Sequence, residues 1–251
     1  MKRLVGFLVS LVLFTLMVPM VDSARAAKPV CDPDKRRAAR ILTQADVPVG
    51  ANFAGADLRC GNYSTINFEN VNLSGANLDG SSIGRFKDVN ADGASFIKAL
   101  VGRPGSGGVS GSFRKANFSG ARLFPGGDAS IYDGANFTDA TIVTNWSATR
   151  KASWIGANFS RAQLVGQFSG DDFTRAKFLG LRRTGPRVFT SAIFVKADFS
   201  KADLTKANFD NANLTGAKFN GAKIQGATFY GSNLTNVNLK TAVGKAFGLT
   251  K

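Results

Sequence analysis

The stretch "ADFSKADLTKANFDNANLTGAKFNGAKIQGATF" (Ala197–Phe229) repeats with a period of five residues. A large apolar residue recurs at every fifth position from Phe199 to Phe229, and the residue two positions earlier is always alanine. In a strand, residues five apart point to opposite faces, and in a helix they lie about 140° apart around the axis. The period therefore excludes both regular elements and indicates a chain that turns after each short extended piece.

We call the large apolar residue of each repeat its centre. The centre and the alanine two positions before it share one face of a short strand, so both can point inward. A chain that turns the same way at each repeat coils around its own core, and each coil hydrogen-bonds to the next. The period continues to Leu239, and the core centres expected in this run are Phe189, Phe194, Phe199, Leu204, Phe209, Leu214, Phe219, Ile224 and Phe229.

Tandem copies of A(D/N)(L/F)xx resemble the pentapeptide-repeat family, and they extend over most of the chain after residue 50. The resemblance implies an all-β fold, a right-handed quadrilateral β-helix with four repeats in each coil. Residues twenty apart would then stack on one another. We therefore expect Phe209 to pack closest to Phe189 and Phe229 among the centres of its run.

The period is interrupted at several places between residues 51 and 239. The main interruptions are "GRPGSGGVSGS" (Gly102–Ser112), "FPGGDASIYDG" (Phe124–Gly134), "VTNWSATRK" (Val143–Lys151) and "LGLRRTGPRV" (Leu179–Val188). Because the repeat resumes after each of them, we expect outward loops on one continuous β-helix that spans residues 51–239.

The N-terminal residues have the features of a secretory signal peptide. Lys2 and Arg3 precede the apolar segment Leu4–Met20, and Ala24-Arg25-Ala26 fits a small-x-small cleavage site. We expect residues 1–26 to be removed and the protein to be exported, to a periplasm, a thylakoid lumen or the outside, with no stable membrane span afterwards. An uncleaved membrane anchor is the alternative.

The two ends of a β-helix expose strand edges, which natural proteins cover or pair. In the N-terminal segment 27–50, Pro33–Pro48 has a helical composition and is expected to cover the first coil. At the other end, residues 240–251 are expected to form a cap in which Val243, Phe247 and Leu249 cover the last coil. A homodimer formed through the C-terminal end is the alternative.

The chain has only two cysteines, Cys31 and Cys60, and both remain after signal cleavage. In an exported chain an even pair indicates one disulfide. A redox-active pair would be expected at closer spacing, typically C-x-x-C. We therefore expect a Cys31–Cys60 bridge that ties the N-terminal segment to the start of the repeats.

Catalytic chemistry is poorly represented in the sequence. The chain has no histidine, which is the commonest general base, and no cysteine beyond the expected bridge. We expect no enzymatic activity, no metal and no cofactor. The one unusual carboxylate pair is Asp171 and Asp172, with Asp171 at a position where alanine is usual. The pair could act as an acid or cation site, but burial of an unpaired carboxylate is costly, so we expect Asp171 to turn outward or to pair with Arg175.

The chain is strongly basic, with 32 Lys and Arg against 17 Asp and Glu and a net charge of +15. Such a surface attracts polyanions and acidic partners. Two interruptions gather the basic residues into a candidate anion or partner patch, although a solvated face that keeps the protein soluble is the alternative. The patch residues are Arg182, Arg183, Arg187, Arg150, Lys151 and Trp146.

The family that the repeats resemble includes acidic members that imitate duplex DNA and act on DNA gyrase. This chain is basic and is expected to be exported, so we do not expect it to mimic DNA toward gyrase. We expect a non-enzymatic exported scaffold for protein interaction or envelope structure. The alternative is a binder of envelope or extracellular polyanions, or of an acidic partner, through the loop arginines.

Overall fold

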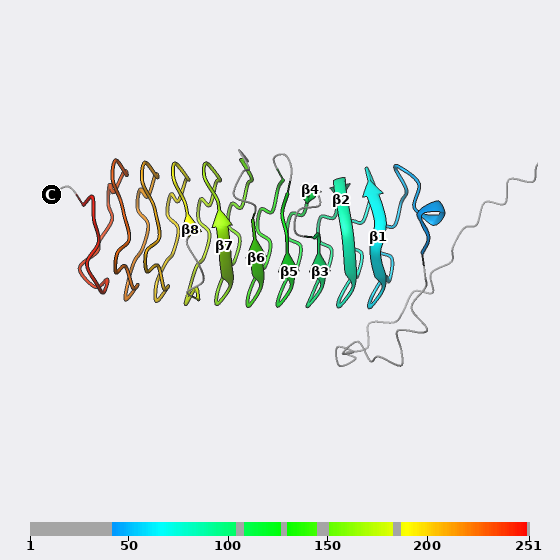
Figure 1. The fold of residues 1–251 in the computed structure, drawn as a ribbon, viewed down its shortest axis with the longest axis horizontal. Helices are drawn as coiled ribbons and strands as arrows, with labels where there is room; N and C mark the ends of the chain where they lie inside the picture. The colour runs from blue at the N-terminus through cyan, green and yellow to red at the C-terminus, as the bar shows by residue number, and fades with distance from the viewer. Residues whose placement is uncertain (1–41, 104–107, 127–129, 145–150, 183–186, 250–251) are drawn as a thin grey trace, which may run out of the picture.

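The chain winds into coils that stack along one axis. In this computed structural model the strands of successive coils lie side by side, and the C-terminal end lies at the opposite end of the axis from β1 (Figure 1). The residues that the structure describes are 42–103, 108–126, 130–144, 151–182 and 187–249. The expected signal peptide therefore lies outside the described residues, and its cleavage stays a prediction.

Parallel strands are the main regular elements. The sheet has the order β1-β2-β3-β5-β6-β7-β8, with β4 paired to β2, and every pairing is parallel. No helix among the described residues has the length and apolar character needed to cross a membrane. The elements are η2 (Gln44–Asp46), β1 (Asn62–Glu69), β2 (Ser82–Asn90), β3 (Leu100–Val101), β4 (Val109–Ser112), β5 (Arg122–Leu123), β6 (Thr141–Val143), β7 (Gln163–Gln167) and β8 (Arg187–Val188).

The backbone pairing places the residues that precede the centres in vertical columns, one residue from each coil. The first column is Asn52, Asn72, Asn90, Ser112, Ile131, Ser153, Asp172, Ile193, Asn213 and Asn233. The second column is Asp57, Asn77, Ser95, Asn117, Asn136, Asn158, Lys177, Asp198, Lys218 and Asn238. The third column is Asn62, Ser82, Leu100, Arg122, Thr141, Gln163, Arg182, Asp203, Lys223 and Val243. A fourth, less continuous column includes Asn208 and Thr228. The expected quadrilateral β-helix is confirmed.

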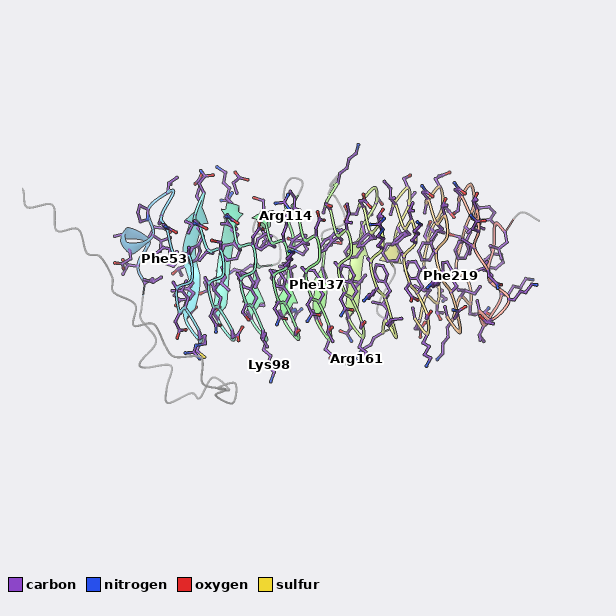
Figure 2. The ribbon with its side chains drawn as sticks, turned by 180° about the vertical axis from the view of Figure 1, so that it is seen from behind. Phe53, Lys98, Arg114, Phe137, Arg161 and Phe219 are labelled. Carbon is purple, nitrogen blue, oxygen red and sulfur yellow. The ribbon has the colours of Figure 1, made fainter. Side chains whose placement is uncertain are left out.

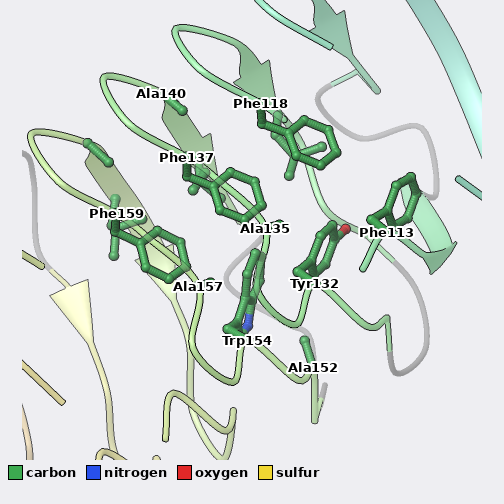
Figure 3. Packing of buried hydrophobic residues seen from close by; sticks show 14 of the residues in the cluster. Phe113, Phe118, Tyr132, Ala135, Phe137, Ala140, Ala152, Trp154, Ala157 and Phe159 are labelled. Carbon is green, nitrogen blue, oxygen red and sulfur yellow. The ribbon is translucent and has the colours of Figure 1, made fainter. Parts of the chain in front are cut away.

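The interior is filled by stacked rings, because centres in one column lie directly over one another. Behind the second column, Phe96, Phe118, Phe137, Phe159, Phe178, Phe199 and Phe219 form a continuous stack with centroids 4.7–5.1 Å apart. Figure 3 shows part of this stack beside the neighbouring one, in which Tyr132 and Trp154 lie 4.2 Å apart. The alanines beside the rings are buried as well.

The nine core centres from Phe189 to Phe229 are at most 3 % exposed. The Phe209 ring lies 5.1 Å from Phe189 and 5.2 Å from Phe229. Its distances to the other aromatic centres that it contacts are longer, between 5.6 and 6.3 Å. The expected stacking at a spacing of twenty residues is therefore confirmed for this ring.

The corners explain why Asn and Asp so often precede a centre. Their side-chain oxygen accepts a hydrogen bond from the backbone N–H two residues later, as from Ser119 N to Asn117 Oδ1 at 3.1 Å. Where serine takes this place, an aspartate of the preceding coil substitutes. Asp133 Oδ1 accepts hydrogen bonds from Ser153 Oγ at 2.6 Å and Ile155 N at 3.0 Å.

The two halves of each coil differ in how strictly they keep their length. From the first to the third column the chain always takes ten residues, as from Ser112 to Arg122 or from Ser153 to Gln163. From the third column back to the first it takes between eight and twelve residues in the middle coils, as from Ser82 to Asn90 or from Leu100 to Ser112. We call these the constant half and the variable half.

A short segment before the first coil covers the N-terminal end of the β-helix, and one of its side chains forms the hydrogen bonds that a neighbouring strand would form. Leu42 and Val47 are buried against the first coil. The carboxamide of Gln44 accepts a hydrogen bond from Asn67 N at 2.8 Å and donates one to Asn67 O at 3.1 Å. One side chain thus pairs both backbone groups of the edge residue in β1. In the part of the expected helical cap that the structure describes, residues 42–48, the helical structure is the single 3₁₀ turn η2, and residues 33–41 lie outside the described residues.

The C-terminal end differs from the expected cover. Val243 and Phe247 pair with Lys223 and Thr228 as outward residues of one more partial coil, and they are 61 % and 45 % exposed. Leu249 is 41 % exposed. Gly244 and Gly248, which follow Val243 and Phe247, lie at the positions that centres occupy in other coils. Glycine has no side chain that could fill the core there. The three apolar residues therefore do not fold over the core, and dimerisation through this end stays a prediction.

Replacement of Gln44 by alanine is expected to weaken the N-terminal end of the β-helix. It removes two hydrogen bonds from the edge of β1, which we expect to lower the free energy of unfolding by about 0.5–1.5 kcal/mol. Amide exchange measured by NMR should accelerate at Asn67 and remain unchanged at Asn117 in the middle of the solenoid. Unchanged protection at Asn67 would contradict the capping role.

Candidate functional site

The interruptions of the period gather on one side of the molecule. Each of the four lies wholly or mainly in a variable half, between a residue of the third column and the next residue of the first. The first three fall on successive coils and the fourth lies two coils further on, and only their ends, residues 132–134 and 179–181, reach into constant halves. We call the side formed by the variable halves of the coils from Ser82 to Ile193 the variable side. Its segments 104–107, 127–129, 145–150 and 183–186 lie outside the described residues.

The bases of these segments pack closely against one another. A Cβ on Gly108 would lie 1.9 Å from Cα of Gly126 in the next coil. A Cβ on Gly166, whose φ is +102°, would lie 2.4 Å from the carbonyl oxygen of Thr144. Both positions require glycine because backbone approaches backbone there. The glycine-rich stretches thus join the irregular segments to the body of the solenoid.

Asp171 is a buried residue of the variable side that forms hydrogen bonds to the preceding coil. Its side chain is buried, with 4 % exposure, so the structure corrects the expectation that it turns outward. Oδ1 accepts a hydrogen bond from Ala152 N, and Oδ2 accepts one from the indole N–H of Trp154, both at 3.0 Å. A buried carboxylate is tolerated when it is hydrogen-bonded in this way. Trp154, an ordinary centre by its spacing, is the partner that sequence reasoning missed.

A second polar group anchors the other end of the same segment. Thr144 is 3 % exposed, and its hydroxyl donates a hydrogen bond to the carbonyl oxygen of Gln167 at 2.7 Å. Thr144 and Ala152 flank residues 145–151, and both form hydrogen bonds to the next coil, Thr144 to Gln167 and Ala152 to Asp171. The entry and exit of this interruption are therefore fixed.

The two adjacent carboxylates serve different purposes. Asp172 occupies an outward position of the first column, and its Oδ1 accepts a hydrogen bond from Thr174 N at 2.8 Å. Asp171 points inward, so the two do not face a common substrate position as an acid and base pair would. Among the residues that the structure describes, no cluster of three potential metal-binding side chains occurs.

Of the six residues of the predicted basic patch, the structure describes the side chains of Arg182 and Lys151, so the patch stays a prediction. Arg182 lies in the third column, and its guanidinium donates a hydrogen bond to Asp139 Oδ1 at 2.9 Å. Lys151 is exposed beside Ala152, whereas Arg187 is described only by its backbone in β8. The remaining patch residues, Trp146, Arg150 and Arg183, lie outside the described residues.

Arg182 belongs instead to a three-residue group that spans three coils. Arg161 binds Asp139 with two hydrogen bonds, from Nε at 3.0 Å and from an Nη at 2.7 Å. These bonds, and the charges of both arginines, lower the pKa of the Asp139 carboxyl below its ordinary value. Sequence reasoning missed Arg161 and Asp139, because the insertions change their separation from the regular twenty residues.

Cys60 lies at a left-handed corner of the first coil, with φ of +59°. Cys31 lies outside the described residues, so the Cys31–Cys60 bridge stays a prediction. Mass spectrometry of the exported protein should find two cysteines protected from alkylation until a reductant is added. Two thiols that react without reductant would contradict it.

Replacement of Asp171 by asparagine is expected to destabilise the protein by about 1–3 kcal/mol, because an amide cannot accept both buried hydrogen bonds without turning an N–H group toward a donor. Asp172→Asn is the matched control and should change stability by less than about 0.5 kcal/mol. Urea unfolding followed by circular dichroism measures both. Equal stability of the two variants would show that the buried contacts of Asp171 are dispensable.

The model of the family "Pentapeptide repeats" matches residues 49–83, 188–221 and 212–242, with eight copies. No curated protein matches the chain. The matched segments flank the interrupted middle coils and contain the regular runs of centres.

Several solved structures of repeat proteins are similar to the chain. HetL of Nostoc sp. strain PCC 7120, a pentapeptide repeat protein involved in heterocyst differentiation regulation, is 22 % identical over 77 % of this chain and 81 % of HetL, with a TM-score of 0.32. QnrB1, a plasmid-mediated fluoroquinolone resistance protein, is 15 % identical over 79 % of this chain and 89 % of QnrB1, with a TM-score of 0.33. A pentapeptide repeat protein from the thylakoid lumen of Arabidopsis thaliana is 20 % identical over 83 % of this chain and 78 % of its own, with a TM-score of 0.15.

At these TM-scores the individual likenesses support no argument about function. The repeat copies and the stacked four-column coils carry the conclusion. The chain is a pentapeptide-repeat protein.

Proposed function

We propose that this protein is an exported, non-enzymatic scaffold that binds a protein partner through its variable side. The observation that carries the proposal is the confinement of all length changes to one half of the coil. The constant half keeps ten residues in every coil, because its inward residues continue the stack without interruption. The variable half departs from that length in successive coils, which a purely structural solenoid does not require.

The framework that carries these segments is tightly packed. The stacked rings of Tyr132, Trp154 and Phe173 lie beside the first column, where the variable halves end, and Asp171 and Thr144 form hydrogen bonds at the two ends of one interruption. Irregular segments carried by a packed framework are a common arrangement for binding sites. The diverging carboxylates of Asp171 and Asp172 and the absence of histidine from the sequence favour binding over catalysis.

Export determines where the partner is sought. The predicted signal peptide directs the search to envelope or secreted proteins, and an envelope-structural role is the variant of this proposal in which the partner is a fixed wall or membrane component. The alternative is that loop arginines bind a polyanion, but Arg182 lies in the third column, in a group with Asp139 and Arg161, and so it is not part of a loop.

Grafting tests the proposal without a change of fold. Residues 204–212 form a regular variable half, so they can replace residues 101–111 or 142–152 and restore the ten-residue spacing. The same residues placed over 224–232 make a matched control, because that half is already regular. The tagged proteins, checked for folding by circular dichroism, are crosslinked in the native envelope and purified.

We expect the wild type and the control graft to capture the same partner. The grafts at 101–111 and 142–152 should reduce its recovery at least tenfold. Full recovery with both of these grafts, or equal loss with the control, would contradict recognition through the variable side.

A further inference from the structure

We propose that the edge between the second and third columns binds a linear anionic polysaccharide. This edge is separate from the variable side, so the inference goes beyond the proposed scaffold function. Figure 2 shows Lys98 and Arg161 projecting from the same edge at different points along the axis, with Arg114 away from it. We call the following residues the cation edge: Lys98, Arg122, Arg161, Arg182, Lys201 and Lys223.

The coil register explains how residues so distant in sequence form one row. Lys98, Arg161 and Lys201 each lie two residues after a second-column centre, at a left-handed corner. The other three members occupy the third column itself. The two positions are neighbours on each coil, two residues apart. Every coil from Lys98 to Lys223 therefore places one cation on the edge, except the coil that carries Asp139.

The spacing of the row follows from the solenoid. Adjacent coils are about 4.8 Å apart, so the six cations extend over roughly 30 Å in steps of about 5–10 Å. All six side chains are exposed. A straight row of this kind complements a polymer with regularly repeated negative groups better than it complements one small anion.

The cation edge has a net positive charge although it also contains acidic residues. Asp139 accepts hydrogen bonds from both Arg161 and Arg182, so one carboxylate fixes two guanidinium groups and leaves net positive charge. The two arginine side chains are still 57 % and 53 % exposed. At the two edge positions of these coils, Asp203 is the only other acid.

The stems of three edge cations lie against the next coil before any ligand binds, as do those of other corner lysines such as Lys115 and Lys196. The Cγ atom of Lys98 lies 3.5 Å from a Cβ built on Gly120, in the next coil. Arg161 lies in the same way over Gly180, and Lys201 over Gly221, both at 3.9 Å. Because glycine has no side chain, each stem lies against the corner of the next coil. Such preorganisation reduces the rotamer entropy lost on binding.

The chemistry of the edge favours a polysaccharide over a nucleic acid. Guanidinium and ammonium groups bind sulfate, phosphate and carboxylate groups, which anionic polysaccharides carry along their length. Proteins that bind single-stranded nucleic acids use aromatic side chains on which bases stack. Among the described residues at the two edge positions there is no aromatic residue, and the neighbouring Phe124 is 6 % exposed. The predicted export also places the protein among extracellular glycans.

Two matched quadruple variants test the edge. The first replaces Lys98, Arg122, Lys201 and Lys223 with glutamine and keeps the group of Asp139, Arg161 and Arg182. The control removes the same charge, three lysines and one arginine, from left-handed corners elsewhere. Its substitutions are Lys115→Gln, Arg175→Gln, Lys196→Gln and Lys206→Gln.

Binding of the exported full chain to immobilised heparin is measured at 0.15 M salt, after circular dichroism has shown that each variant is folded. We expect the edge variant to bind at least tenfold more weakly, with a smaller salt dependence, and the control to bind within threefold of the wild type. Equal weakening of both variants would overturn the proposal, because it would assign binding to net charge alone.

Competition identifies the class of polymer. Heparin should displace the protein at a lower charge concentration than polyphosphate or single-stranded DNA. More effective displacement by DNA or by polyphosphate would overturn the assignment to a polysaccharide. The variable-side grafts should retain heparin binding, so a failure of the scaffold proposal and a failure of this one are distinguishable.

Discussion

The stacking of each centre on the centre one coil before it is the constraint on which the rest of the structure depends. The interior is narrow, so a ring must lie over a ring and an alanine must leave room beside it. This stacking requires a fixed number of residues between columns only where inward residues follow one another without interruption. The constant half meets that requirement with ten residues in every coil, and the variable half returns the chain to the first column by routes of different length.

Much of this architecture could be predicted from the sequence, because it is a matter of period. The five-residue spacing is enough to assign Phe209 to an inward position, and the resemblance to a known repeat is enough to place it between Phe189 and Phe229. The preference for Asn and Asp before a centre also has a local cause in the corner turns. These properties are repeated many times, so a single irregular repeat does not obscure them.

The candidate sites could not be predicted in the same way, because they depend on register across insertions. Asp139, Arg161 and Arg182 meet only after two variable halves of different length have been traversed. The burial of Asp171 depends on the indole N–H of Trp154 in the preceding coil, and no local pattern connects the two. The C-terminal end shows the same limit. The five-residue spacing after Leu239 predicts centres at Gly244 and Leu249, but Phe247 pairs with Thr228, nineteen residues away, and Val243, Phe247 and Leu249 are all exposed.

The constant half and the variable half thus differ in the changes of length that they accept, and insertion of one residue tests this difference most directly. One glycine inserted between Ser119 and Gly120 lengthens a constant half, and one inserted between Gly126 and Gly127 lengthens the variable half of the same coil. Urea unfolding should show a loss of about 3 kcal/mol or more for the first insertion, because it displaces inward residues from the stack. It should show a loss of less than about 1 kcal/mol for the second. Equal destabilisation by the two insertions would contradict the account.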